Sequence, residues 1–218
     1  MRYSLLFILT LLASCSSNVK DRTPDTFFKL IIGAQKESDI HPCSDYGSRR
    51  NYQGEPYYLK LGRQITRHEG IDFCTQAGAE VIAPANGTVA WLVQTDPLVG
   101  GSVVIQSKIK QPITIGDDLV ETNLFLSVFH IFPSNDLKVG DVVKAGQTIG
   151  RTEPPGKYAI GPRAHVHIEL HTSRFNWGQH TDPNQFWQKG RGIVSCFDPN
   201  NPPLDSQIVA PVRCKSKQ

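Results

Sequence analysis

The residues best suited to chemistry in this sequence gather in the heptapeptide Ala164–Leu170, where polar and apolar side chains alternate without a break. In a β-strand, successive side chains point to opposite faces. His165, His167 and Glu169 would therefore share one face of such a strand. Two imidazoles and a carboxylate on a rigid strand favour a metal site over a hydrophobic core. An edge strand with incidental histidines is the plainer alternative, and a second cluster upstream argues against it.

The second cluster consists of His68 and Asp72, which stand four residues apart. Gly70 between them, and the apolar residues that alternate with them, predict an extended segment rather than a helix. His68 and Asp72 would then face the same way. Two imidazole nitrogens and one carboxylate hold Zn²⁺ in many catalytic sites and leave a fourth position open for water. The sequence therefore predicts a catalytic zinc site.

The elements that must position these residues are short strands that recur about every ten residues. An Asn-Gly pair at Asn86-Gly87 predicts a hairpin turn between two of them. Residues 108–121 are polar and predict a loop. Because no long stretch has the helical period, we expect an all-β fold, an antiparallel sandwich or barrel. The expected strands lie within 57–65, 80–93, 102–106, 123–130, 139–150 and 164–170.

Several short motifs follow one another in an order typical of one family. They are His68–Asp72, Val81–Val89, Phe129–Ile131, Val139–Gly150, Gly161-Pro162, His165–Glu169 and Asp182-Pro183. Together they resemble the lysostaphin-type (LytM-type) zinc metallopeptidases, and the resemblance covers about half of the chain. It implies a β-sandwich or barrel-like peptidase core with hairpins like those of lipoyl barrels.

The resemblance also implies a role for each site residue. His165 would be the catalytic histidine, and His130 would join it in orienting water and stabilising the oxyanion. Glu169 would orient a ligating imidazole. Zn²⁺ would activate water, with a pKa near ~7, against a peptide of bacterial peptidoglycan, in a cross-link or a stem. The zinc ligands would be His68, Asp72 and His167.

Two departures from the family pattern lie on the expected rim of the cleft. Arg163-Ala164 separates Gly161-Pro162 from the His-x-His pair, and Pro154–Tyr158 replaces a loop rich in Gly, Ser and Thr. Both changes bear on substrate choice more than on the metal. Arg163 could pair with a carboxylate of the wall peptide, because arginine binds carboxylates through two parallel hydrogen bonds.

Two other functions compete with the peptidase. A non-catalytic wall-binding or amidase-activating lipoprotein would keep the fold and lose the ligands, whereas here the ligands are intact. A lipoyl-type carrier would need a lysine at a hairpin tip between apolar neighbours, and it would leave the histidines unexplained. A regulatory protein partner that uncovers the cleft is compatible with the peptidase. The net charge of +3 is spread along the chain and argues against nucleic acid.

The first fifteen residues predict an export signal. Arg2 precedes the apolar run Leu5–Leu12, which is too short for a permanent membrane span. The run ends in Leu12-Ala13-Ser14-Cys15, which resembles a bacterial lipobox, so Cys15 would carry the lipid and begin the mature chain. An ordinary cleaved signal is the alternative. Because Ser16 and not Asp follows, we expect the outer membrane of a Gram-negative cell, with the protein facing the periplasm.

Four cysteines remain, an even number that predicts two disulfides in an exported chain, with three possible connectivities. We expect Cys43–Cys74, tying an N-terminal extension to the core, and Cys196–Cys214, closing the tail. The remaining histidines, His41, His171 and His180, are expected at the surface. The division we predict is a signal at 1–15, a tether and extension at 16–56, a metallopeptidase domain at 57–187 and a disulfide-closed tail at 188–218.

Overall fold

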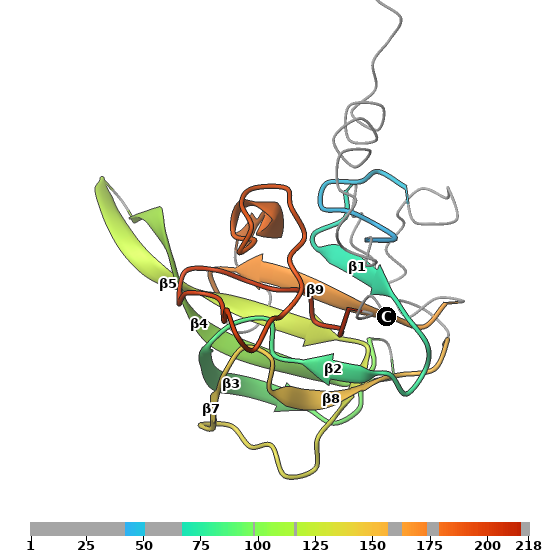
Figure 1. The fold of residues 1–218 in the computed structure, drawn as a ribbon. Coiled ribbons are helices and arrows are strands. Elements are labelled where there is room, and N and C mark those ends of the chain that lie inside the picture. Colours follow the sequence, from blue (N-terminus) through green and yellow to red (C-terminus); the bar gives the residue numbers. More distant parts are fainter. Residues whose placement is uncertain are drawn as a thin grey trace, which may run out of the picture. The chain divides into compact units, whose positions relative to one another are not determined.

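A computed structural model describes residues 42–50, 67–97, 99–115, 117–156, 163–173 and 179–214 (Figure 1). The chain divides into two units, Met1–Lys36 and Glu37–Gln218, and every described residue belongs to the second. These residues form β-strands and one short 3-10 helix, η2 (Pro183–Gln185), and contain no α-helix. None of their helices is long and apolar enough to cross a membrane. The expected all-β class is therefore confirmed.

Some of the expected features lie outside the described residues. They are the export signal with Cys15, the first expected strand at 57–65, His41 and the Gly161-Pro162 pair.

The larger of two sheets carries the predicted site. Its strands pair antiparallel in the order β1-β9-β5-β4-β3-β7, and β10 pairs with the end of β9. Its members are β1 (Ile71–Cys74), β9 (His165–His171), β5 (Asp118–Phe129), β4 (Ser102–Ile115), β3 (Gly87–Val93), β7 (Val142–Val143) and β10 (His180–Thr181). The smaller sheet, in the order β2-β8-β6, consists of β2 (Glu80–Ile82), β8 (Thr148–Thr152) and β6 (Ile131–Pro133).

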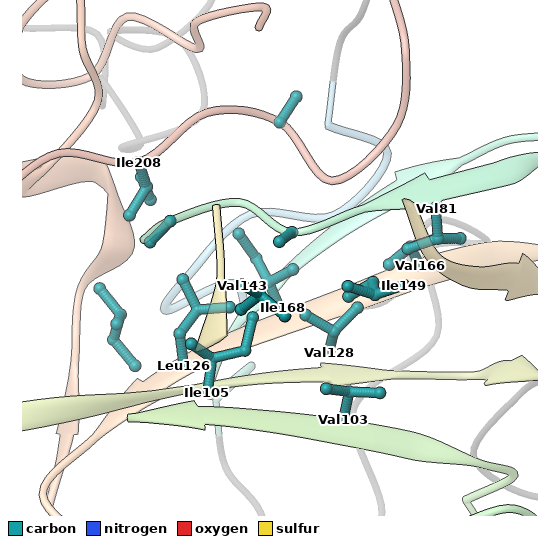
Figure 2. Packing of buried hydrophobic residues seen from close by; sticks show 14 of the residues in the cluster. Val81, Val103, Ile105, Leu126, Val128, Val143, Ile149, Val166, Ile168 and Ile208 are labelled. Atoms are coloured by element: carbon teal, nitrogen blue, oxygen red, sulfur yellow. The ribbon is translucent and has the colours of Figure 1, made fainter. Parts of the chain in front are cut away.

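One hydrophobic core joins both sheets (Figure 2). From β9 it takes Val166, Ile168 and Leu170, each at most 1% exposed. Residues of the small sheet, such as Val81 and Ile149, pack into the same cluster. The alternation read in the sequence is thus confirmed for the apolar face of β9. Each such side chain contributes roughly 1.5–3 kcal/mol by its burial, which fixes the register and leaves the histidines on the other face.

The hairpin predicted at Asn86-Gly87 is wrong. The strands on either side of this pair belong to different sheets, because β2 pairs with β8 while β3 pairs with β4 and β7. Asn86 holds a corner instead: its Oδ1 accepts the Ala145 N–H at 2.9 Å. Gly87 already lies in β3, where an added Cβ would collide with the carbonyl of Gln106. The glycine therefore serves close strand packing rather than a turn.

The polar loop predicted at 108–121 is also wrong. There β4 and β5 continue as one long hairpin, with Lys110 opposite Asn123 and Pro112 opposite Glu121. Residues 117–121 are all exposed. Ile109 at the base of the hairpin is fully buried in the core, whereas the tip has no buried face, so nothing there requires the apolar alternation that marks a strand.

Candidate metal centre and active site

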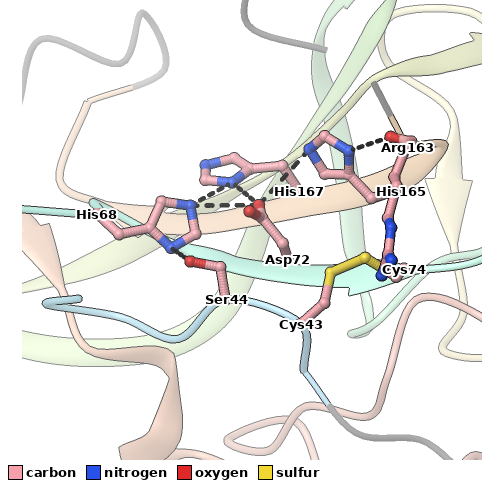
Figure 3. The surroundings of a disulfide bond; sticks show 8 residues. All are labelled: Cys43, Ser44, His68, Asp72, Cys74, Arg163, His165 and His167. Carbon is pink, nitrogen blue, oxygen red and sulfur yellow. Dashed lines mark hydrogen bonds and ion pairs between the residues drawn. A yellow bond between two sulfur atoms is a disulfide. The ribbon is translucent and has the colours of Figure 1, made fainter. Parts of the chain in front are cut away.

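Neighbouring strands bring the three predicted ligands together. Asp72 of β1 lies directly opposite His167 of β9, and His68 precedes β1 by three residues. His167 Nδ1 lies 2.6 Å from Asp72 Oδ1 and 3.1 Å from His68 Nε2 (Figure 3). The distance from His68 Nε2 to Asp72 Oδ1 is 3.2 Å. Zinc bonds of about 2.0–2.2 Å separate tetrahedral ligand atoms by roughly 3.3–3.5 Å. The 3.1 and 3.2 Å separations come close to this spacing, whereas the 2.6 Å separation is that of a hydrogen bond, which an ion would have to widen.

The electrostatics of this cluster suit a cation. Burial alone would raise the pKa of the Asp72 carboxyl, but hydrogen bonds from His167 and His68, and their charge, hold it well below its usual range. Burial alone would lower the pKa of His167, yet Asp72 and Glu169 raise it to about 10. Without a metal ion, the extra proton on His167 thus balances the negative charge of Asp72 and Glu169. Two imidazoles and one carboxylate form a donor set that Zn²⁺ fits in place of that proton.

His68 is oriented by the segment that precedes the domain. Its Nδ1–H donates to the Asp45 carbonyl at 3.0 Å, with Ser44 Oγ at 3.3 Å, so Nε2 faces the other ligands. The segment runs along β1: the Cys43 N–H donates to the Asp72 carbonyl, and the Asp72 N–H donates to the Ser44 carbonyl, both at 2.8 Å. Part of the predicted extension is therefore built into the candidate metal centre.

A disulfide fastens this segment to β1. The structure joins Cys43 to Cys74, and it joins Cys196 to Cys214, the two pairs expected from the sequence. Cys74 is two residues beyond the predicted ligand Asp72, and Cys43 is next to Ser44 (Figure 3). Sequence reasoning missed Ser44 and Asp45 as supports of His68. The expected Cys43–Cys74 pair was the signal that could have located them.

Glu169 and Gly70 fix the ring of His167. The Nε2–H of His167 donates to Glu169 Oε1 at 2.8 Å, which leaves Nδ1 for the metal. Burial alone would raise the pKa of Glu169, but this bond and the charge of His167 lower it to about 2. A Cβ added at Gly70 would approach the His167 ring to 2.7 Å, so only glycine leaves room for the imidazole.

The other two histidines form a second pair beside the metal cluster. His165 Nδ1–H donates to the Arg163 carbonyl at 2.9 Å, and His165 Nε2 lies 3.7 Å from Asp72 Oδ1. His130 Nδ1–H donates to the Val99 carbonyl at 2.8 Å, and its ring centroid is 4.6 Å from that of His165. Burial lowers the pKa of His130 to about 3 and also lowers that of His165. Both rings are therefore neutral, with an Nε2 lone pair.

A buried glutamate clamps the backbone of His130, which has a left-handed φ of 62°. The Glu153 N–H donates to the His130 carbonyl at 2.9 Å, and Glu153 Oε1 accepts the Gly101 N–H at 2.8 Å. The Gly101 carbonyl in turn accepts the Ile131 N–H at 3.2 Å. Glu153 is 5% exposed, and burial raises its pKa. No pattern in the sequence marks Glu153 for this task.

Two histidines expected at the surface are not there. His171, the last residue of β9, is fully buried, and its Nε2 lies 2.6 Å from Ser127 Oγ. Only 11% of the His180 side chain is exposed, and it lies between Glu69 and Glu169. The polar face of β9 continues to its end because β5 and β10 cover His171 from either side.

A groove of about 500 Å³ opens at the end of β9 that carries His165. Its lining includes Thr75, Ala77, Pro155 and Arg163. The Arg163-Ala164 step, which departs from the family pattern, thus borders this groove, whose lining includes neither His165 nor His130.

Comparison with known proteins places the chain in a family. The model described as Peptidase family M23 matches residues 66–183, more than half of the chain. The chain belongs to peptidase family M23. The lysostaphin-type resemblance read in the sequence is confirmed. This M23 chain is 29% identical over 154 residues to the glycyl-glycine endopeptidase ALE-1 of Staphylococcus capitis, which is 70% of this chain and 38% of that relative. The chain therefore spans well under half of the relative's length.

Two solved structures are among those similar to this M23 chain. A catalytic-domain mutant of the prophage-encoded M23 protein EnpA from Enterococcus faecalis is 29% identical, with a TM-score of 0.44 over 67% of this chain and 91% of that one. The catalytic domain of lysostaphin from Staphylococcus simulans is 22% identical, with a TM-score of 0.44 over 66% of this chain and 90% of that one.

Proposed function

We propose that this protein is a zinc-dependent endopeptidase that hydrolyses peptide cross-links or stem peptides of bacterial peptidoglycan. The observation that carries the proposal is the convergence of His68, Asp72 and His167 on one buried point, with two neutral imidazoles beside it. A family of peptidases and a relative named as a glycyl-glycine endopeptidase support the same reaction class.

The protein's own groups supply the proton transfers. When bound, Zn²⁺ would provide an activated water and polarise the scissile carbonyl. His165 and His130 each donate through Nδ1 to a backbone carbonyl, so each presents Nε2 as an acceptor. A proton taken from water by one of these rings makes it a donor. That ring can then stabilise the oxyanion and protonate the leaving amine.

The groove at Arg163 is the proposed site for the substrate's peptide chain. Its arginine suits a carboxylate, and a stem peptide carries carboxylates on its side chains and terminus. Arg163 is therefore proposed to select stems with free carboxylates over amidated ones.

We further propose that the chain is a lipoprotein anchored through Cys15 in the outer membrane and facing the periplasm. The support is Leu12-Ala13-Ser14-Cys15 at the end of an apolar run, with Ser16 after it. Labelled palmitate should enter the wild-type chain and not a Cys15→Ala variant. If both proteins were labelled equally, or if neither were labelled, the proposed lipid anchor at Cys15 would be wrong.

The peptidase proposal is tested by metal content and wall digestion together. Wild type, His167→Ala and the control Val142→Ala, which alters an exposed residue of β7, are loaded with zinc and given dye-labelled peptidoglycan. Wild type and the control should bind zinc and release dye, whereas His167→Ala should do neither. Wall binding with no release by any of the three would favour the non-catalytic wall-binding function.

A further inference from the structure

A second cluster of ligand-type side chains lies directly behind the metal centre. Glu69, Glu169 and His180 bring two carboxylates and an imidazole to within 4.8 Å of one another. Glu169 Oε2 is 3.7 Å from His180 Nδ1, and Glu69 Oε2 is 3.8 Å from His180 Nε2. These separations are too long for hydrogen bonds. The side chains of Glu69, Glu169 and His180 therefore lie close together, but these atoms are not hydrogen-bonded to one another.

Two buried atoms in this cluster lack partners. Glu169 Oε2 and His180 Nδ1 are shielded from solvent and make no hydrogen bond with any described residue. Glu169 is 6% exposed, and its other oxygen is taken by His167. A buried polar atom left without a partner costs about 1–3 kcal/mol, and more when it carries charge. Both unpartnered atoms, Glu169 Oε2 and His180 Nδ1, would be satisfied by a ligand bound between them.

We propose that Glu69, Glu169 and His180 form a second site for a divalent cation, of the kind that Zn²⁺ fills with carboxylate and imidazole donors. Bonds of about 2.0–2.2 Å span ligand atoms up to roughly 4.4 Å apart. Small movements of the Glu69 side chain, which is 24% exposed, close the remaining gap. The ion offers Glu169 Oε2 and His180 Nδ1 the partner that the protein does not.

Glu169 couples this site to the first. One of its oxygens accepts from His167 Nε2, and the other faces the second site. A cation held there fixes the carboxylate that orients His167, so each ion alters the affinity for the other by the same factor. The second site is the more open one: 24% of the Glu69 side chain is exposed, against 7% for His68 and 6% for Asp72. It should therefore bind more weakly than the first.

Zinc titration of the metal-free full-length protein by calorimetry, with metal analysis at fixed free Zn²⁺, tests this proposal. Wild type should bind two ions, the second at least tenfold more weakly. His180→Ala and Glu69→Gln should each bind one, whereas Glu121→Gln, which changes an exposed carboxylate of β5, should bind two. Asp72→Ala should lose the tight ion and keep the weak one.

A single ion in wild type, with His180→Ala indistinguishable from it, would overturn the second site and leave His180 as a side chain packed between two carboxylates. Circular dichroism of His180→Ala checks its fold, and Glu69→Gln repeats the test where a side chain is partly exposed. Peptidoglycan digestion by the one-ion protein would leave the proposed function standing, so the two proposals fail independently.

Discussion

The two disulfides provide a matched pair of perturbations that separates metal binding from stability. One variant replaces Cys43 and Cys74 by serine, and the other replaces Cys196 and Cys214. The bonded residues are 31 and 18 positions apart. By loop-closure entropy, these bonds stabilise the fold by about 3.7 and about 3.2 kcal/mol at 25 °C. The two variants should therefore lose nearly equal free energy of unfolding, which urea unfolding measures.

Zinc affinity should distinguish them. Only the first bond holds the segment whose Asp45 carbonyl accepts from His68 and whose Ser44 lies against it. Loss of such a support weakens a metal site by roughly 10- to 100-fold. A chelator competition well below both unfolding transitions should show that loss for the Cys43/Cys74 variant and less than about a twofold change for the other. Equal zinc affinities in the two variants would refute the role assigned to the segment.

Three further outcomes test other parts of the structure. Glu153→Gln keeps the acceptor for Gly101 and removes the charge. Because burial raises the pKa of Glu153, the folded protein holds that proton more tightly than the unfolded chain, so wild-type stability falls as pH rises through the folded pKa. The urea-unfolding advantage of Glu153→Gln should thus grow from about pH 4 to 7, and a constant difference would contradict this. Leu170→Ala, at a fully buried position, should cost about 2–5 kcal/mol by the same method, and a loss below ~1 would contradict the packing. Arg163→Ala should lower kcat/KM on carboxylate-bearing stems about tenfold or more and spare amidated stems; equal values on both would exclude its proposed role.

The sequence predicts how Asp72 and His167 are placed because the alternation of side chains along a strand decides it. On β9, burial of Val166, Ile168 and Leu170 forces the intervening polar residues to the opposite face, and the antiparallel register sets Asp72 beside His167. The alternation of apolar and polar residues is visible in the local sequence and is retained in the folded strand. The all-β class and the pairing of Asp72 with His167 follow from it, whereas His68 precedes β1 and is oriented by Asp45 and Ser44.

What the sequence does not predict depends on contacts between distant segments. Asn86-Gly87 has the residues of a hairpin turn, but the Asn86 side chain is committed to Ala145, and the two strands part into different sheets. His180 sits in a polar stretch, yet β9 and Glu169 bury it. Asp45 acts through a backbone carbonyl, which no residue type reveals.

The most direct test of the central claim is mass analysis of the muropeptides released from purified peptidoglycan. Zinc-loaded wild type should create new amino and carboxyl termini within the peptide part of the wall, whereas the metal-free protein and His167→Ala should create none. Intact peptides after treatment with zinc-loaded wild type, or the same new termini produced by His167→Ala, would contradict the account.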